Sequence, residues 1–101
     1  MRTETTLHFA PDHPAFAGHF PGSPIVPGVV LLDAAVRAAL EALRATAGTA
    51  CQVNSAKFLS PVGPGETLDL IIEITPAGGA HFAISSGARK VATGTLVLPS
   101  P

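Results

Sequence analysis

The chain has 101 residues, the size of one domain, and folding a chain of this length buries roughly two-thirds of its surface. Hydrophobic residues make up 47% of the sequence and charged residues only 13%, so we expect a single domain over residues 1–101 that hides further apolar surface in at least a dimer. A net charge of −1 and the absence of Trp and Tyr argue against binding to nucleic acid.

The sequence has no recognisable targeting or membrane segment. Residues 1–6 lack the apolar core of a signal peptide, and no stretch approaches the ~18 uncharged apolar residues of a membrane span, so we expect a cytoplasmic protein. Cys51 is the only cysteine, which excludes an internal disulfide, and we expect it to pack as a small core residue. His8, His13 and His81 are not spaced as metal ligands and should be structural or surface residues.

A strand over residues 5–10 is predicted first, followed by a segment rich in proline and glycine. Six of the eleven residues 18–28 are Gly or Pro. Each proline restricts its own backbone and that of the preceding residue, so this loop should be stiff enough to hold a side chain in place.

A long helix is predicted over residues 29–47, because this Ala- and Leu-rich run contains no Gly or Pro before Gly48. One apolar face of this helix is expected to contain Val29, Leu32, Val36, Ala39, Leu40 and Leu43. A charged stripe contains Asp33, Arg37, Glu41 and Arg44. Most other positions are also apolar, so the helix should be wrapped on several sides by a curved sheet.

After Gly48 the hydrophobic pattern changes to a period of two, which is typical of half-buried strands. The alternation is clearest over residues 67–75, and similar strands are expected at 51–59, 80–86 and 90–98. The connections at 61–65, 76–79 and 86–87 are short enough for antiparallel hairpins. The predicted fold is α+β, with one long central helix and a curved, mainly antiparallel sheet of about five strands.

His19 and Asp33 indicate a proton-transfer site beside the start of this helix. They are fourteen positions apart, with the stiff loop between them. Histidine is a base near neutral pH. Pro27 fixes its own backbone, and Gly28 leaves its backbone N–H open to close approach by a ligand.

These residues resemble the β-hydroxyacyl-acyl carrier protein dehydratases, which have the hotdog fold. The resemblance is carried by the sequence Gly-His-Phe-Pro-Gly at 18–22, by Pro24 and the Pro-Gly pair at 27–28, and by Asp33 five positions into the helix. It continues in the Lys-Phe pair at 57–58 and in residues 61–68, where the family has a Pro-Gly-acidic turn. The similarity therefore covers most of the chain.

The resemblance implies a lyase of fatty acid biosynthesis that acts as a homodimer on an acyl thioester, with acyl carrier protein as the expected carrier. His19 would take the α-proton, and Asp33 of the partner subunit would be the acid or would position a water at the β-hydroxyl. The backbone N–H of Gly28 would receive the thioester oxygen. Phe16, Phe20 and Val29 would line the acyl channel, and no metal or organic cofactor is expected.

Two departures from the family pattern keep other functions open. Arg37 stands where the family commonly has Gln, and a pair between the two would favour the ionised form of Asp33. The chain is also short for the family and has no Tyr for an aromatic gate at the tunnel mouth. The alternatives are a hotdog thioesterase, and a catalytically silent acyl-binding or dimerisation module in which Asp33 belongs to a solvated surface stripe.

Overall fold

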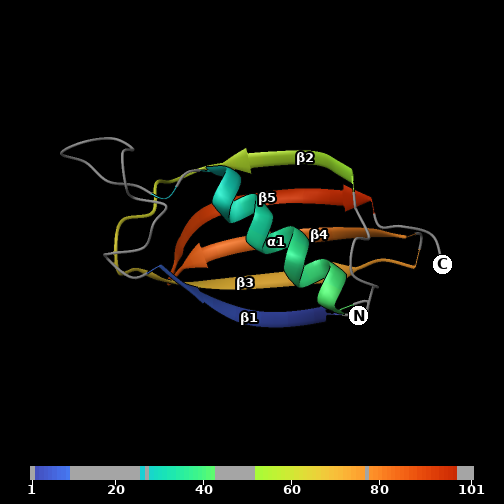
Figure 1. Cartoon of the computed structure of the whole chain (residues 1–101), viewed down its shortest axis with the longest axis horizontal. Helices are drawn as coiled ribbons and strands as arrows, with labels where there is room; N and C mark the ends of the chain where they lie inside the picture. The colour runs from blue at the N-terminus through green and yellow to red at the C-terminus, as the bar shows by residue number, and fades with distance from the viewer. Residues whose placement is uncertain (1, 10–25, 27, 43–51, 77, 98–101) are drawn as a thin grey trace.

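One helix lies across a five-stranded antiparallel sheet (Figure 1). The computed structural model describes residues 2–9, 26, 28–42, 52–76 and 78–97. The strands follow the order β1-β3-β4-β5-β2 across the sheet, and each described pairing is antiparallel. The elements in chain order are β1 (Arg2–His8), α1 (Gly28–Ala42), β2 (Gln52–Phe58), β3 (Thr67–Ile74), β4 (Gly79–Ser86) and β5 (Arg89–Val97).

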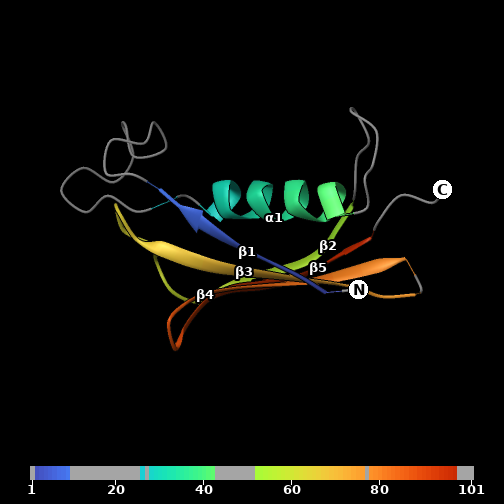
Figure 2. The ribbon, with the colours of Figure 1, turned by 90° about the horizontal axis from the view of Figure 1, so that it is seen from below.

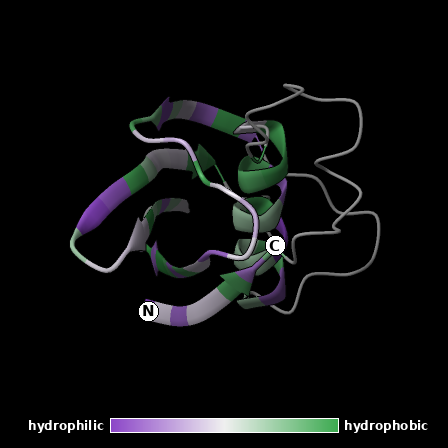
Figure 3. Cartoon of the chain, turned by 90° about the vertical axis from the view of Figure 1, so that its left-hand side faces the viewer, coloured by the Kyte–Doolittle hydropathy of each residue, from purple (hydrophilic) through white to green (hydrophobic). Residues whose placement is uncertain are grey.

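The predicted α+β class, with its curved sheet of about five strands, is confirmed. Alternation along β3 directs Leu68, Leu70 and Ile72 into the core, where they are almost completely buried. The helix covers this face of the sheet (Figure 2), and its ribbon is mainly hydrophobic, whereas hydrophobic and hydrophilic residues follow one another along the strands (Figure 3). Among the described residues, the buried core contains no polar or charged side chain.

The helix packs on the sheet through one leucine and two alanines that are buried. Leu31, Ala35 and Ala39 are buried, whereas Val29 lies on the exposed side with 71% of its surface accessible. The predicted apolar face is therefore confirmed in part: Ala39 is buried and Leu32 and Val36 pack partly buried against the core, whereas Val29 was wrongly included. A helix that is apolar around most of its circumference gives little indication of which side faces the sheet, and two alanines allow the closest approach.

Two of the three predicted hairpins are present. The β3–β4 and β4–β5 connections join neighbouring strands, with positive φ angles of 89° at Gly78 and 60° at Gly87. The predicted hairpin at 61–65 was wrong, because β2 lies at the edge beside β5 and the chain must cross to β3. The first strand also begins earlier than predicted, at Arg2, and ends at His8.

Several predictions fall on residues outside the described ranges. These are the helical residues 43–47 with the stop at Gly48, the core position of Cys51, and the last residue of the predicted strand 90–98. Within the part of the chain that the structure describes, no helix is long and apolar enough to cross a membrane.

Candidate active site

The start of α1 is attached to the loop of residues 59–66, which joins β2 to β3. The backbone N–H of Val26 donates to the carbonyl oxygen of Val62 at 2.8 Å, and both residues are buried. The helix begins two residues later, at Gly28. The first N–H groups of a helix have no acceptor within it and lie at its positive end. Gly28 is therefore positioned as expected for an oxygen-binding N–H, although its role stays a prediction.

An apolar hollow of about 350 Å³ opens beside this helix end. The aromatic ring of Phe58, at the end of β2, closes over Gly28: a Cβ atom built at Gly28 would lie 3.1 Å from the ring. Glycine at this position thus also leaves space for an aromatic neighbour. The hollow is lined by Val26, Gly28, Leu31, Phe58, Leu59, Ser60 and Pro61.

Sequence reasoning did not identify Phe58 and Leu59 as site residues. Half of each residue's surface is exposed, at 50% and 53%, and Val29 on the adjoining helix is still more exposed. Large apolar side chains exposed together indicate a surface that another molecule covers. The available signal was an aromatic and a leucine at a strand end, separated by one serine from the Pro-Val-Gly-Pro-Gly run at 61–65.

Asp33 lies on the exposed stripe of α1, together with Val29, Arg37 and Glu41. Its Oδ2 is 2.9 Å from Nε of Arg37, and the two side chains are 59% and 77% exposed. An exposed pair of this type contributes only a few tenths of a kcal/mol to stability. The ion pair expected if Asp33 belongs to a solvated surface stripe is thus present in the isolated chain.

The remaining predicted site residues, His19, Phe16 and Phe20, lie outside the described residues. In the sequence, Phe9 precedes the segment 10–25 that contains His19, and Val26 follows it. Both flanking residues are fixed to the loop of residues 59–66: Gly65 N–H donates to the Phe9 carbonyl at 2.7 Å, and Val26 N–H donates to Val62.

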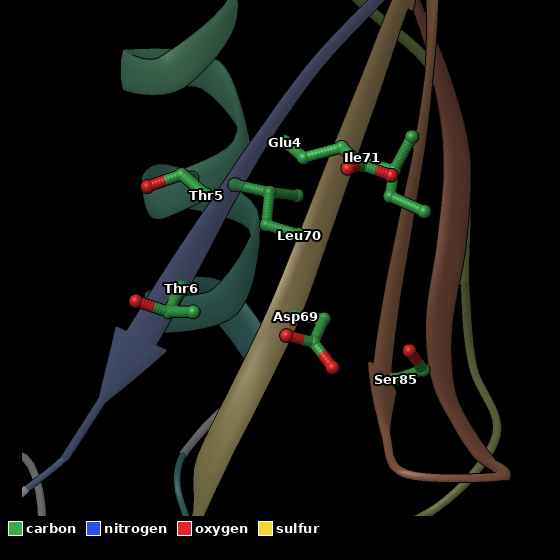
Figure 4. A pocket seen from close by; sticks show the side chains of 7 residues that line it. All are labelled: Glu4, Thr5, Thr6, Asp69, Leu70, Ile71 and Ser85. Carbon is green, nitrogen blue, oxygen red and sulfur yellow. The ribbon is translucent and has the colours of Figure 1, made fainter.

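A larger hollow, of about 410 Å³, lies away from this site (Figure 4). Its side chains come from β1, β3 and β4, and Asp69 and Ile71 alternate with residues that face the core. It therefore opens on the face of the sheet opposite α1, away from the candidate site. Within the described ranges, no three His, Cys, Asp or Glu side chains are grouped as metal ligands.

Comparison with known proteins supports the resemblance seen in the sequence. The model of the ApeI-like family, described as ApeI dehydratase, matches residues 1–95. The chain belongs to the ApeI-like dehydratase family. The match includes the Pro/Gly loop, α1 and the strands of the sheet. Together with the similar proteins below, it confirms that the chain has the hotdog fold and is related to the β-hydroxyacyl-acyl carrier protein dehydratases.

Among curated proteins, this ApeI-like chain is similar to 3-hydroxyacyl-acyl-carrier-protein dehydratase FabZ of Chlamydia trachomatis serovar L2. The two are 41% identical over 97 residues, which cover 84% of this chain and 63% of the relative. The chain spans about three-fifths of the length of the curated relatives that it matches.

Two solved structures define the fold. One, the dehydratase heterocomplex ApeI:P from Xenorhabdus doucetiae, is similar with a TM-score of 0.84 and 26% identity, over 98% of this chain and 88% of that one. The other is the fluoroacetyl-CoA-specific thioesterase FlK, with a TM-score of 0.64 and 15% identity, over 95% of this chain and 88% of that one. The likeness to the thioesterase shows the shared hotdog fold alone.

Proposed function

We propose that this chain removes water from a β-hydroxyacyl thioester to give the trans-2-enoyl thioester. The family match over residues 1–95 is the observation that carries the proposal. The relatives named for 3-hydroxyacyl-acyl-carrier-protein dehydration supply the substrate class and favour acyl carrier protein as the carrier. We further propose that residues 1–101 form a single hotdog domain that works in the cytoplasm.

In the proposed reaction, His19 removes the proton next to the thioester carbonyl. Negative charge then develops on the thioester oxygen, and the Gly28 N–H at the positive end of α1 stabilises it. The β-hydroxyl leaves as water after receiving a proton from Asp33 of the partner subunit, or from a water that this carboxyl group orients. The position of Gly28 at the start of α1, beside an apolar hollow, supports this arrangement. No metal or organic cofactor is part of the proposal.

The acyl chain is proposed to occupy the apolar surface around this hollow. Phe58 and Leu59 expose apolar surface there, and Val29 lies on the adjoining turn of α1. Phe16 and Phe20 are proposed to complete the lining from the loop that precedes the helix. Such a channel binds hydrocarbon by removing it from water, at roughly 25 cal/mol per Å² of buried apolar surface.

A homodimer is proposed to form through β2. Among the described strands, this edge strand pairs only with β5, and six of its seven residues are exposed. Val53 and Phe58 place apolar side chains along this edge, whose backbone groups are suited to pairing with another strand. The N-terminal end of α1 lies close to the end of β2 (Figure 1), so a second copy paired there would approach the candidate site.

The Asp33–Arg37 pair is the observation that favours the second candidate, a catalytically silent acyl-binding or dimerisation module. In that module the carboxylate would remain paired at the surface. A third candidate, a thioesterase with the same fold, would direct water at the thioester carbonyl. The three candidate functions differ in their products: enoyl thioester, free thiol, or neither.

The test is an assay of the wild-type protein and the His19→Ala variant on a short β-hydroxyacyl group, carried on acyl carrier protein and, in parallel, on coenzyme A. Formation of the conjugated enoyl thioester is followed by absorbance, and free thiol is measured in the same reaction. We expect the wild-type protein to form enoyl product, and the variant to lose at least about 100-fold in rate. Equal rates, or release of thiol alone, would overturn the proposed dehydration.

A further inference from the structure

The carboxylate of Glu66 connects the β2–β3 loop to the turn between β4 and β5. Its Oε2 accepts a hydrogen bond from the Gly63 backbone N–H at 2.6 Å. Its Oε1 accepts from Ser86 Oγ at 3.3 Å and pairs with Nη2 of Arg89. The side chains of Glu66 and Arg89 are only 30% and 42% exposed, so this pair is more sheltered from water than the other ion pairs of the described chain.

Arg89 makes a second contact with the same loop. Its Nη1 donates to the backbone carbonyl of Pro61 at 3.0 Å, while Nη2 binds Glu66. One guanidinium therefore joins the beginning of the loop to its end, and the carboxylate adds Gly63 in the middle. A planar group with several fixed donors can make both contacts at once, which a lysine ammonium does poorly.

The loop held in this way carries the two backbone contacts described above. Val62 accepts the Val26 N–H directly before α1, and Gly65 donates to the carbonyl of Phe9 at the end of β1. These contacts attach both residues that flank the segment 10–25, which contains His19. Residues 59–66 form neither helix nor strand, so the side-chain bonds from Glu66 and Arg89 replace the hydrogen bonds that regular structure would supply.

We propose that Glu66 and Arg89 are positioning residues for the active site. They hold the loop of residues 59–66, which in turn fixes Phe9 and Val26 and thereby the start of α1 at Gly28. The catalytic part of this inference rests on the proposed dehydration. Proton transfer and oxyanion binding depend strongly on the placement of the reacting groups, so a small displacement lowers the rate of the chemical step.

Two variants separate the effect of the ion-pair charge from the effect of the hydrogen-bond geometry. Glu66→Gln keeps the size of the side chain and one oxygen for Gly63, but it removes the ion pair with Arg89. Arg89→Lys keeps the positive charge but loses the double contact with Glu66 and Pro61. The matched control is Glu73→Gln, which breaks the more exposed contact between Arg2 and Glu73.

Amide hydrogen exchange tests the positioning independently of activity. In Glu66→Gln and Arg89→Lys, we expect protection of the Val26 and Gly65 amides to fall about tenfold. Amides in the centres of β3 and β4 should be unaffected, and Glu73→Gln should match the wild type throughout. Unchanged protection at Val26 and Gly65 in both folded variants would overturn the proposal.

Kinetics on a β-hydroxyacyl thioester test the catalytic part. We expect both variants to lose about tenfold in kcat per folded chain, with KM within about twofold of wild type, because the substrate-binding surface is retained. Loss of amide protection with unchanged kcat would overturn the positioning role. An inactive wild-type protein whose variants still lose protection would overturn the proposed dehydration and support the structural part of the inference.

Discussion

The Asp33 carboxylate lies 2.9 Å from Nε of Arg37 on the exposed stripe of α1. This oxygen is therefore held by the guanidinium rather than by a substrate hydroxyl or a water. In the proposed enzyme, Asp33 of the partner subunit supplies the acid or orients a water, so Arg37 competes with the substrate for this group. An exposed pair four residues apart is weak enough for the substrate to displace it.

Replacing Arg37 with Gln, the residue common in the family at this place, should therefore raise activity. We expect Arg37→Gln to increase kcat about twofold, since an exposed pair contributes only about 0.3–0.5 kcal/mol. Glu41→Gln on the same stripe is the control and should leave kcat unchanged. Steady-state kinetics measure both, and a large loss of activity in Arg37→Gln would mean that Arg37 itself assists the reaction.

At the scale of the elements, the centre of the sheet depends on a glycine. Gly94 of β5 lies opposite Phe82 of β4, and a Cβ atom built there would be 2.3 Å from the Phe82 ring and 2.4 Å from the Ser55 carbonyl oxygen. The ring of Phe82 thus uses the space that the missing side chain leaves between β4 and β2. Because the carbonyl belongs to the backbone, it cannot move aside as a flexible side chain can.

Gly94→Ala should accordingly destabilise the fold. We expect the free energy of unfolding to fall by at least about 2 kcal/mol, measured by urea denaturation. Gly63→Ala is the matched control, because the nearest atom to its new Cβ would be Glu66 Oε2 at 3.7 Å, an ordinary contact. Similar unfolding midpoints for the two variants would contradict the packing described for Phe82.

The elements with a strong local pattern could be predicted from the sequence. Alternation identified β3 and β4 nearly to the residue, and the absence of Gly and Pro identified α1. The crossing from β2 to β3 could not be predicted, because a short loop of Pro and Gly fits a hairpin as well as a crossover. The buried side of α1 could be predicted only in part, since apolar residues surround most of the helix. The predicted face included the buried Ala39, but it also included the exposed Val29 and omitted Ala35.

The candidate site could likewise be predicted only in part from the sequence. Gly28 could be placed at the helix start from the residues that precede it. Its contact with Phe58 could not be predicted, because thirty positions separate the two and β2 meets α1 only through the strand order of the whole sheet. The attachment of Phe9 and Val26 to residues 59–66 is likewise a long-range contact without a local pattern.

At the scale of the whole molecule, β2 is the exposed edge strand through which we propose the dimer. Val53→Lys places a charge there and should shift the protein toward monomer, measured by sedimentation velocity. Thr5→Lys on β1, at the opposite edge of the sheet, is the control and should leave the assembly unchanged. A Val53→Lys protein that remains fully dimeric would contradict pairing through β2. If the site requires two chains, dehydration should fall in proportion to the loss of dimer.

The central claim, a dehydratase site completed by two copies of this chain, is tested most directly by mixing inactive subunits. His19→Ala and Asp33→Asn proteins are assayed separately and then after subunit exchange in equal amounts, with enoyl thioester formation as the readout. A mixed dimer contains one site with both residues intact, so we expect recovery to about one-quarter of the wild-type rate per chain from two nearly inactive proteins. No recovery after mixed dimers are detected by native mass spectrometry would contradict the shared site.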